Sequence, residues 1–448
     1  MPIPMKRSRY NRVVQIDGED RFLLFNGVTA GLVSFDRQLF QKVQEIMNAV
    51  EDGGYVPEDE AGRNIYATLV DGRFIVPKSV DELDLLKVRY NASRFNDRLS
   101  LTILPTLACN LACTYCYERA RPESMTRETM DAICAFVEDR ARRERIDRFH
   151  VSWYGGEPLL TASTVWELSE SFLKLSEQYG FRYTASMTTN GTLLTKEVAD
   201  NLLRYNVTSM QVTVDGPKEV HDARRPFKST QGSSFDAILG NLEHVVGRLT
   251  VAARVNTDKR NAGAAVELLK VFADKGWLGE SKRFYPYMAA VAKMTEVCAD
   301  IAHECCTVES FFDLSMDFCK ACAAYGVPIK THALYHFPVA MKYNCGAIAL
   351  NTMVVNPSGA IYKCGLTVSD ESESLGNIRE PMDLVNPNLL KWLSYDPFDV
   401  EECRECDLLP ICLGGCPKRV LEGEHPTQGE SCEYTKKNID SILILHGG

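Results

Sequence analysis

The stretch Leu99-Ser-Leu-Thr-Ile-Leu-Pro-Thr-Leu-Ala-Cys109-Asn-Leu-Ala-Cys113-Thr-Tyr-Cys116 joins an apolar strand to a loop with three cysteines. The cysteines follow the spacing C-x3-C-x2-C, so their thiols share one tight loop directly after the strand. Clustered thiols of this kind indicate metal ligation, and the plainer interpretations are a zinc knuckle or buried free cysteines. A four-iron cluster normally takes four thiolates, so three on one loop would leave one iron open to a small chelating molecule.

Composition narrows the class of protein. The 448 residues suggest two or three domains. The 60 acidic and 50 basic residues give a net charge of −10, which argues against nucleic-acid binding. No apolar run approaches the roughly 18 residues of a membrane helix, and the basic start leads into no signal-peptide core, so we expect a cytoplasmic protein. Its 16 cysteines are clustered, which in that compartment favours metal binding or catalysis over disulfides.

Residues 96–335, around the cysteine loop, alternate apolar strand candidates with helical stretches. Six strand-then-helix units predict an α/β fold with a parallel sheet, either doubly wound or curled into a barrel. In both forms the catalytic groups belong at the carboxyl ends of the strands. Polar residues fall at those ends: Gly155-Gly156-Glu157-Pro158, Thr189-Asn190-Gly191, Asp215-Gly216 and Asn256.

The two flanking segments differ in kind. Residues 1–95 show short strand-like stretches and two or three helical patterns, which predicts a small α+β module. Residues 336–448 are rich in Cys, Gly and Pro and short on periodicity, so metal would have to stabilise them. We therefore divide the chain into three parts, 1–95, 96–335 and 336–448.

The C-x3-C-x2-C loop, followed by Gly155-Gly156-Glu157-Pro158, resembles the radical S-adenosylmethionine (SAM) superfamily. The resemblance implies a partial (β/α)6 TIM-like barrel in which Cys109, Cys113 and Cys116 ligate a [4Fe–4S] cluster. SAM on the open iron would be cleaved reductively to a 5′-deoxyadenosyl radical. The residues expected to contact SAM are Tyr115, Gly155, Gly156, Glu157, Asn190, Thr213 and Asn256.

The C-terminal cysteines are similar to the SPASM extension of peptide-modifying radical SAM enzymes, which carries two auxiliary [4Fe–4S] clusters. Position by position, Cys345, Cys364 and Cys416 would hold the first auxiliary cluster, and Cys403, Cys406, Cys412 and Cys432 the second. Seven thiolates cannot fill eight sites, so the first cluster either has an open iron or takes a further cysteine. A zinc ribbon over 403–416 is the alternative. We expect Cys319, Cys322 and Cys134, which lie upstream in helical stretches, to be buried core residues.

The SPASM resemblance implies a peptide substrate. Residues 1–95 are similar in kind to the winged-helix-like leader-binding (RRE-like) module of peptide maturases, which adds an extended leader to a sheet edge. Sulfatase activators place a catalytic Asp directly after the second SPASM cysteine, whereas Gly365-Leu366 follow Cys364 here. We therefore expect a maturase that installs thioether crosslinks, of the sactipeptide or ranthipeptide type, in a ribosomal precursor peptide.

Other functions stay open from the sequence. They are a carbon–carbon crosslink, formylglycine formation, and a non-enzymatic iron–sulfur electron carrier or regulator. The expected partners are the precursor peptide with its leader and an electron donor such as flavodoxin or ferredoxin, without nucleic acid or membrane. Asp215-Gly216, His221-Asp222 and Arg224-Arg225 either contact SAM or the substrate, or form a turn and a solvated face.

Overall fold

Two compact units make up the chain in the computed structural model, which describes residues 3–52, 55, 57–118, 121–144, 146–229, 232–293, 295–328, 337–427 and 429–447. One unit combines residues 1–95 with 335–348 and 394–448. The other combines residues 96–334 with 349–393. The boundary predicted at residues 335–336 lies outside the described residues, and the division into three parts with their functions stays a prediction.

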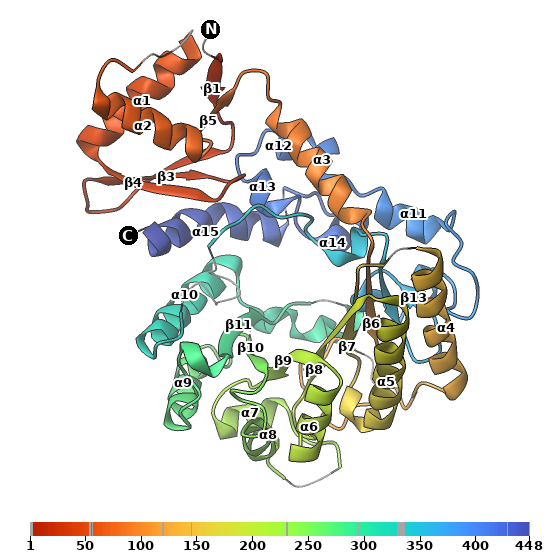
Figure 1. Cartoon of the computed structure of the whole chain (residues 1–448). Coiled ribbons are helices and arrows are strands. Elements are labelled where there is room, and N and C mark those ends of the chain that lie inside the picture. Colours follow the sequence, from red (N-terminus) through yellow and green to blue (C-terminus); the bar gives the residue numbers. More distant parts are fainter. Residues whose placement is uncertain are drawn as a thin grey trace. The chain divides into compact units, whose positions relative to one another are not determined.

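A curved parallel sheet organises the second unit (Figure 1). Its six successive parallel strands lie side by side in chain order. They are β6 (Arg98–Ile103), β7 (Arg148–Trp153), β8 (Arg182–Thr189), β9 (Val207–Thr213), β10 (Thr250–Thr257) and β11 (Phe284–Ala290). Beyond β6, the sheet continues through β12 (Thr352–Val355), which is parallel to β6, and β13 (Ile361–Tyr362), which is antiparallel. The predicted α/β fold with a partial barrel is confirmed.

Helices surround the outside of this sheet (Figure 1). They are α4 (Arg127–Arg143), α5 (Ala162–Tyr179), α6 (Lys196–Arg204), α7 (Lys218–Arg224), α8 (Ser234–Leu242), α9 (Ala264–Asp274) and α10 (Val308–Ala324), and α11 (Pro387–Leu393) lies later in the same unit. Strand residues alternate between two faces. In β7, Phe149 and Val151 are fully buried apolar residues, whereas His150 and Ser152 between them are only half-buried. The inner face of the sheet is therefore polar and partly open.

The first unit contains a three-stranded antiparallel sheet of β2 (Asn11–Gln15), β3 (Arg21–Asn26) and β4 (Gly31–Asp36). Strand β1 (Met5–Arg7) pairs with β5 (Ile75–Pro77), and the helices are α1 (Arg37–Asp52), α2 (Glu60–Asp71) and α3 (Glu82–Arg94). Helix α1 buries Phe40, Val43 and Met47 at helical spacing, and Leu24 belongs to the same core. Residues 1–95 therefore contain the predicted mixture of helices and antiparallel strands, and their role as a module of their own stays a prediction.

The C-terminal segment of the first unit consists of the short helices α12 (Glu401–Arg404), α13 (Leu409–Cys412) and α14 (Pro417–Leu421), followed by α15 (Glu430–Gly447). Ile439 and Leu443 of α15 join Leu23 and Phe25 of β3 in one apolar cluster. Arg12 forms ion pairs with Asp407 and Asp440 at 2.9 and 2.5 Å. In the described part of the chain, no helix is both long and apolar enough to cross a membrane.

Candidate active site

A cavity of about 380 Å³ lies at the carboxyl ends of the parallel strands. This volume falls within the range of small-molecule sites. Nine of the ten residues predicted to bind the cluster or SAM line it: Cys109, Cys113, Cys116, Tyr115, Gly155, Gly156, Asn190, Thr213 and Asn256. The structure thus brings together residues from five different loops and strand ends.

The three thiols of the cysteine loop lie close enough to influence one another. Burial raises the pKa of Cys113 and raises that of Cys116 to about 11, and negative charge on Cys109 raises both further. Without metal these thiols are therefore protonated at neutral pH. A bound metal centre stabilises the thiolates instead, and soft sulfur donors of this kind suit iron–sulfur clusters. In the part of the chain that the structure describes, no three ligand side chains converge on a site for a single ion.

Two glycines allow the loop after β7 to lie against the backbone that leads into the cysteines. The Gly156 and Glu157 N–H groups donate to the carbonyls of Thr106 and Ala108 at 3.1 and 2.8 Å. A Cβ atom at Gly155 would lie 2.4 Å from the Thr106 carbonyl oxygen, and one at Gly156 would lie 2.2 Å from that of Ala108. Gly155 also has φ +119°. Only glycine fits this close approach.

Glu157 is the one predicted SAM contact that does not line the cavity. Its fully buried carboxylate accepts hydrogen bonds from the backbone N–H groups of Leu159 and Asn190, at 3.0 and 2.6 Å. The Thr189 hydroxyl donates to the same carboxylate at 2.8 Å. Glu157 therefore ties the Gly-Gly loop to the end of β8. Its predicted contact with the SAM amino group stays a prediction.

The side chain of Tyr115 ends in a buried polar network. Its hydroxyl donates to Asp215 and accepts hydrogen bonds from Arg225 Nη1 at 2.7 Å and Asn256 Nδ2 at 3.0 Å. The Arg224 guanidinium lies over the ring, 5.0 Å from its centroid. Burial raises the pKa of Tyr115 well above its ordinary value, so the hydroxyl stays a donor. The network fixes one side of the cysteine loop.

Charged residues after β9 complete this network. Arg224 forms ion pairs with Asp258 at 2.8 Å and Asp215 at 3.6 Å. His221 is fully buried, its Nδ1 accepts the Asp215 N–H at 3.2 Å, and burial together with the charges of Arg225 and Arg224 lowers its pKa. Arg224 and Arg225 are both 6% exposed, so the solvated-face interpretation is wrong for them.

Several residues that line the cavity were not predicted from the sequence, among them Tyr117, Glu118, Tyr154, Gln211, Arg254 and Leu366. The Tyr117 and Tyr154 hydroxyls are hydrogen-bonded, and burial raises the pKa of Glu118 to about 7. The position of Arg254 could have been predicted from the sequence, because Arg254 stands two residues before Asn256 in β10 and therefore lies on the same face of that strand. Tyr154 precedes the Gly-Gly pair, but nothing in the pattern indicated where its hydroxyl lies.

The cysteines predicted for the second auxiliary cluster lie together within the first unit. Burial raises the pKa of Cys403 to about 11, and the charges of Cys412, Cys406 and Cys432 add to this rise. The Cys406 N–H donates to the Cys403 carbonyl at 3.2 Å, which closes a tight turn between two of the thiols. Ligation of a cluster by these four thiols stays a prediction.

The cysteines predicted for the first auxiliary cluster are divided between the units. Cys345 and Cys416 belong to the first unit. Asn344, which precedes Cys345, donates from Nδ2 to the carbonyls of Leu413 and Gly415 at 2.8 and 2.5 Å, and this links the segment before Cys345 to the segment before Cys416. Cys364 belongs to the second unit, so this ligand set stays a prediction. Cys319 and Cys322 are buried in α10, as expected for core residues.

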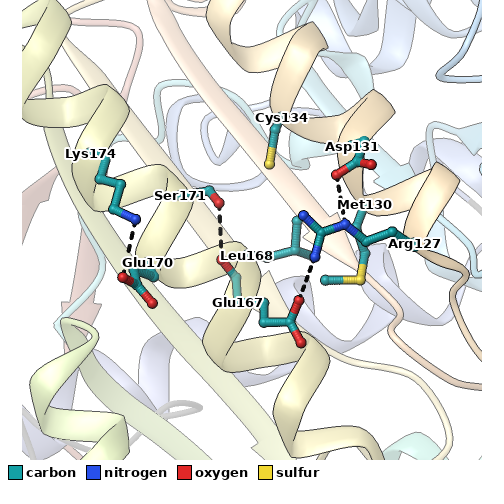
Figure 2. Close-up of a pocket in the computed structure, with 9 residues that line it drawn as sticks. All are labelled: Arg127, Met130, Asp131, Cys134, Glu167, Leu168, Glu170, Ser171 and Lys174. Atoms are coloured by element: carbon teal, nitrogen blue, oxygen red, sulfur yellow. Dashed lines mark hydrogen bonds and ion pairs between the residues drawn. The ribbon is translucent and has the colours of Figure 1, made fainter.

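A second, smaller cavity of about 180 Å³ lies between α4 and α5 (Figure 2). Arg127 forms ion pairs there with Asp131 at 3.0 Å and Glu167 at 2.8 Å, and all three side chains are largely exposed. Exposed pairs of this kind contribute little stability. Cys134 lines this cavity and is only half-buried, so the expectation that it is a core residue is wrong.

Comparison with known proteins identifies the class. Residues 103–252 match the family model of the radical SAM superfamily, so the chain carries a radical SAM domain. Domains of this family bind a [4Fe–4S] cluster and SAM, and the predicted cofactors are confirmed at that level. The assignment of individual ligands stays a proposal.

Among curated proteins, the chain resembles the cysteine-type anaerobic sulfatase-maturating enzyme of Clostridium perfringens, with 24% identity over 71% of this chain and 88% of the relative. It also resembles the mycofactocin maturase MftC of Mycobacterium tuberculosis, with 26% identity over 77% and 85%. The predicted resemblance to radical SAM enzymes that modify peptides is confirmed.

Solved structures share the fold. Native anSMEcpe with bound AdoMet matches with a TM-score of 0.61 and 19% identity, over 78% of this chain and 98% of that chain. Streptococcus suis SuiB bound to precursor peptide SuiA matches with a TM-score of 0.55 and 14% identity, over 96% of this chain and all of SuiB, 100%. The second match spans both units of the chain.

Proposed function

We propose that the protein is a radical SAM maturase that installs thioether crosslinks, from cysteine sulfur to carbon, in a ribosomally made precursor peptide. The observation that carries this proposal is the cavity in which three cysteines, the Gly-Gly loop and three strand-end residues face one another. The resemblance to a sulfatase-maturating enzyme and a mycofactocin maturase supports the general class of reaction.

Cys109, Cys113 and Cys116 would hold the cluster, and Tyr115, Asn190, Thr213 and Asn256 would surround SAM. A [4Fe–4S] cluster with one open iron supplies the electron for reductive cleavage of chelated SAM. We assign the SAM carboxylate to Arg225, which lines the cavity and is buried. Its Nε atom has no hydrogen-bond partner among the described residues. An unpaired buried guanidinium N–H favours an anionic ligand.

The first unit would recognise the leader of the precursor. Among the described residues, β4 pairs with β3 on one side and with no strand on the other. An extended peptide can add to such an edge through main-chain hydrogen bonds. The electron donor would be a flavodoxin or ferredoxin.

The wall of the cavity beside Cys364 favours thioether formation over formylglycine formation. Leu366 lines the cavity at that place, and Gly365 stands where sulfatase activators carry their catalytic Asp. Gly365 and Leu366 therefore supply no carboxylate base of the kind that sulfatase activators carry at this position. Formylglycine formation is the second candidate, because two of the similar proteins are named as cysteine-type and serine-type sulfatase-maturating enzymes.

The proposed reaction balances without an external oxidant. One electron cleaves the S–C5′ bond of SAM, methionine leaves, and one hydrogen atom passes from the acceptor carbon into 5′-deoxyadenosine. The substrate thiol loses its proton, the new S–C bond forms, and the electron released would return to an iron–sulfur cluster, so that SAM is the net oxidant. The peptide therefore loses two hydrogen atoms and a free thiol.

The test is anaerobic incubation of the reconstituted enzyme with SAM, reductant and any short cysteine-containing peptide that is encoded beside its gene. We expect 5′-deoxyadenosine together with a peptide that lacks two hydrogen atoms and resists thiol alkylation. Cys113→Ala should abolish both products, and Cys134→Ala, which removes a thiol outside the site, should retain them. A modified peptide that keeps its free thiols would refute the thioether assignment, and formylglycine in a sulfatase-derived peptide would establish the second candidate.

A further inference from the structure

Arg254 carries a positive charge into the cavity that neither the cluster nor the SAM contacts account for. It rises from β10, is half-buried, and lines the cavity beside Thr213, its neighbour across the sheet. Its Nε donates to Asn256 Oδ1 at 2.7 Å, which fixes the plane of the guanidinium. Neither of its Nη groups has a hydrogen-bond or ion-pair partner among the residues that the structure describes. Arg254 thus presents the two-donor side that carboxylates bind.

Other charges in the cavity do not neutralise this guanidinium. Asp215 is engaged by Tyr115 and Arg224, and Glu157 is turned away from the cavity. Glu118 lines the same cavity but forms no ion pair with Arg254 within the described part of the chain. Apart from Glu118, the lining residues of the cavity carry no carboxylate, and Gln211 and Leu366 are uncharged. The positive charge is therefore available to a ligand.

Electrostatics place Arg254 and Tyr154 in one region. Burial raises the pKa of the Tyr154 hydroxyl, the charge of Glu118 adds to this rise, and the charge of Arg254 opposes it. Tyr154 follows β7 and Arg254 stands in β10, so the two reach the cavity from different strands. Tyr154 and Arg254 both line the cavity, so a group that binds Arg254 lies in the same cavity as Tyr154.

Two arginines, Arg225 and Arg254, line the cavity, but SAM has only one carboxylate to bind. Arg225 is the more deeply buried of the two, and its charge opposes the burial-driven rise in the pKa of Cys113, which places it beside the cysteine loop. Arg225 therefore suits the methionine end of SAM. The peptide must approach the same cavity, because hydrogen abstraction requires near contact between the reacting atoms. Arg254 is left for the peptide.

We propose that Arg254 binds the carboxylate of an acidic side chain of the peptide substrate, and so selects an Asp or Glu at or next to the modified residue. This assignment deepens the proposed function and rests on it. A bidentate arginine–carboxylate contact is shorter and stronger than a neutral hydrogen bond, and it fixes the orientation of the bound group. Arg254 is accordingly a specificity residue that orients the peptide.

The test uses N-acetyl-L-aspartate N-methylamide and its asparagine counterpart as probes, titrated by NMR against the reconstituted enzyme loaded with SAM. We expect the wild-type enzyme to bind the aspartate probe about 10-fold or more tighter than the asparagine probe, as befits a hydrogen-bonded charge pair. R254Q should abolish this preference, and R254K should retain part of it. R248Q, which removes an arginine that pairs with Asp200 outside the cavity, should leave it unchanged.

SAM affinity, measured separately, decides between the two possible anions. The proposal expects R254Q to bind SAM as the wild type does. It is overturned by equal binding of both probes to the wild type, or by a R254Q enzyme that loses SAM affinity while it keeps the probe preference. Failure of the proposed function has a different signature, namely that the wild type yields no 5′-deoxyadenosine from SAM at all.

Discussion

Removal of the Tyr115 hydroxyl tests whether the buried network holds the cysteine loop. In Tyr115→Phe the ring stays, but Asp215 loses a donor, and Arg225 and Asn256 lose an acceptor at 2.7 and 3.0 Å. Hydrogen bonds to charged groups are each worth about 1.5–3 kcal/mol. Because Asp215 keeps Arg224 at 3.6 Å and the Asn256 N–H at 3.0 Å, part of that loss is recovered. We expect a net loss of about 3 kcal/mol in the free energy of unfolding.

The matched control is Tyr183→Phe. This tyrosine is also buried, at 3% exposed, but its hydroxyl makes a single long hydrogen bond of 3.4 Å to Ser169. Its removal should cost less than about 1 kcal/mol.

Urea unfolding of anaerobically purified protein, followed by tryptophan fluorescence, measures both variants. Trp153 is fully buried at the end of β7, close in sequence to the Gly-Gly loop, and reports on the second unit. The Tyr115 variant should also hold less iron after reconstitution, because the loop that carries the thiols is less well fixed. Equal unfolding free energies and equal iron contents for the two variants would refute the role assigned to the network.

Other changes test the close packing and the buried charges of the site. Gly156→Ala should prevent cluster incorporation, because its Cβ atom would lie 2.2 Å from a carbonyl oxygen. Gly240→Ala is the control, because no atom lies within 4 Å of the added Cβ atom, and it should be neutral or stabilising by up to about 1 kcal/mol. Iron analysis and thermal unfolding distinguish the two variants. Burial keeps the pKa of His221 below its ordinary 6.5, so the unfolded chain binds the extra proton. Stability is then complete above about pH 6.5 and falls by up to about 1.4 kcal/mol per pH unit below it, and a slope unchanged in His221→Gln would contradict this assignment. Glu157→Gln should lower the unfolding free energy by about 2 kcal/mol even without SAM. The reason is that an amide cannot accept every hydrogen bond that the carboxylate accepts from Leu159, Thr189 and Asn190. A change confined to SAM affinity would instead favour the predicted contact between Glu157 and the SAM amino group.

Much of the barrel could be predicted from the sequence because it depends on local patterns. Strands such as Leu99–Ile103 alternate or run apolar, and polar residues mark where each parallel strand ends, so the positions of Asn190 and Asn256 at one cavity followed from topology alone. The cysteine spacing and the Gly-Gly pair added the cofactors. Close backbone approach explains that glycine pair, although the approach itself is a tertiary feature.

Side-chain direction could not be predicted in the same way. Glu157 follows the Gly-Gly pair directly, yet its carboxylate turns inward to the backbone of Asn190. Arg224 and Arg225 look like a solvated charge pair until their partners Asp258 and Tyr115, far away in sequence, are placed beside them. The grouping of the C-terminal segment with residues 1–95 was likewise invisible, because no periodicity links the two segments.

If the proposed function holds, that grouping would couple iron loading to leader recognition. The proposed leader-binding sheet and the segment with four cysteines share one apolar core, in which Leu23 and Phe25 pack with Ile439 and Leu443. Arg12 of the sheet also forms ion pairs with Asp407 and Asp440 of the C-terminal segment. Removal of either the sheet or the segment with four cysteines would therefore expose the apolar core that they share. Under the proposed function, loss of iron from Cys403, Cys406, Cys412 and Cys432 should weaken binding of the precursor peptide, so that a cell short of iron would leave its peptides unbound as well as unmodified.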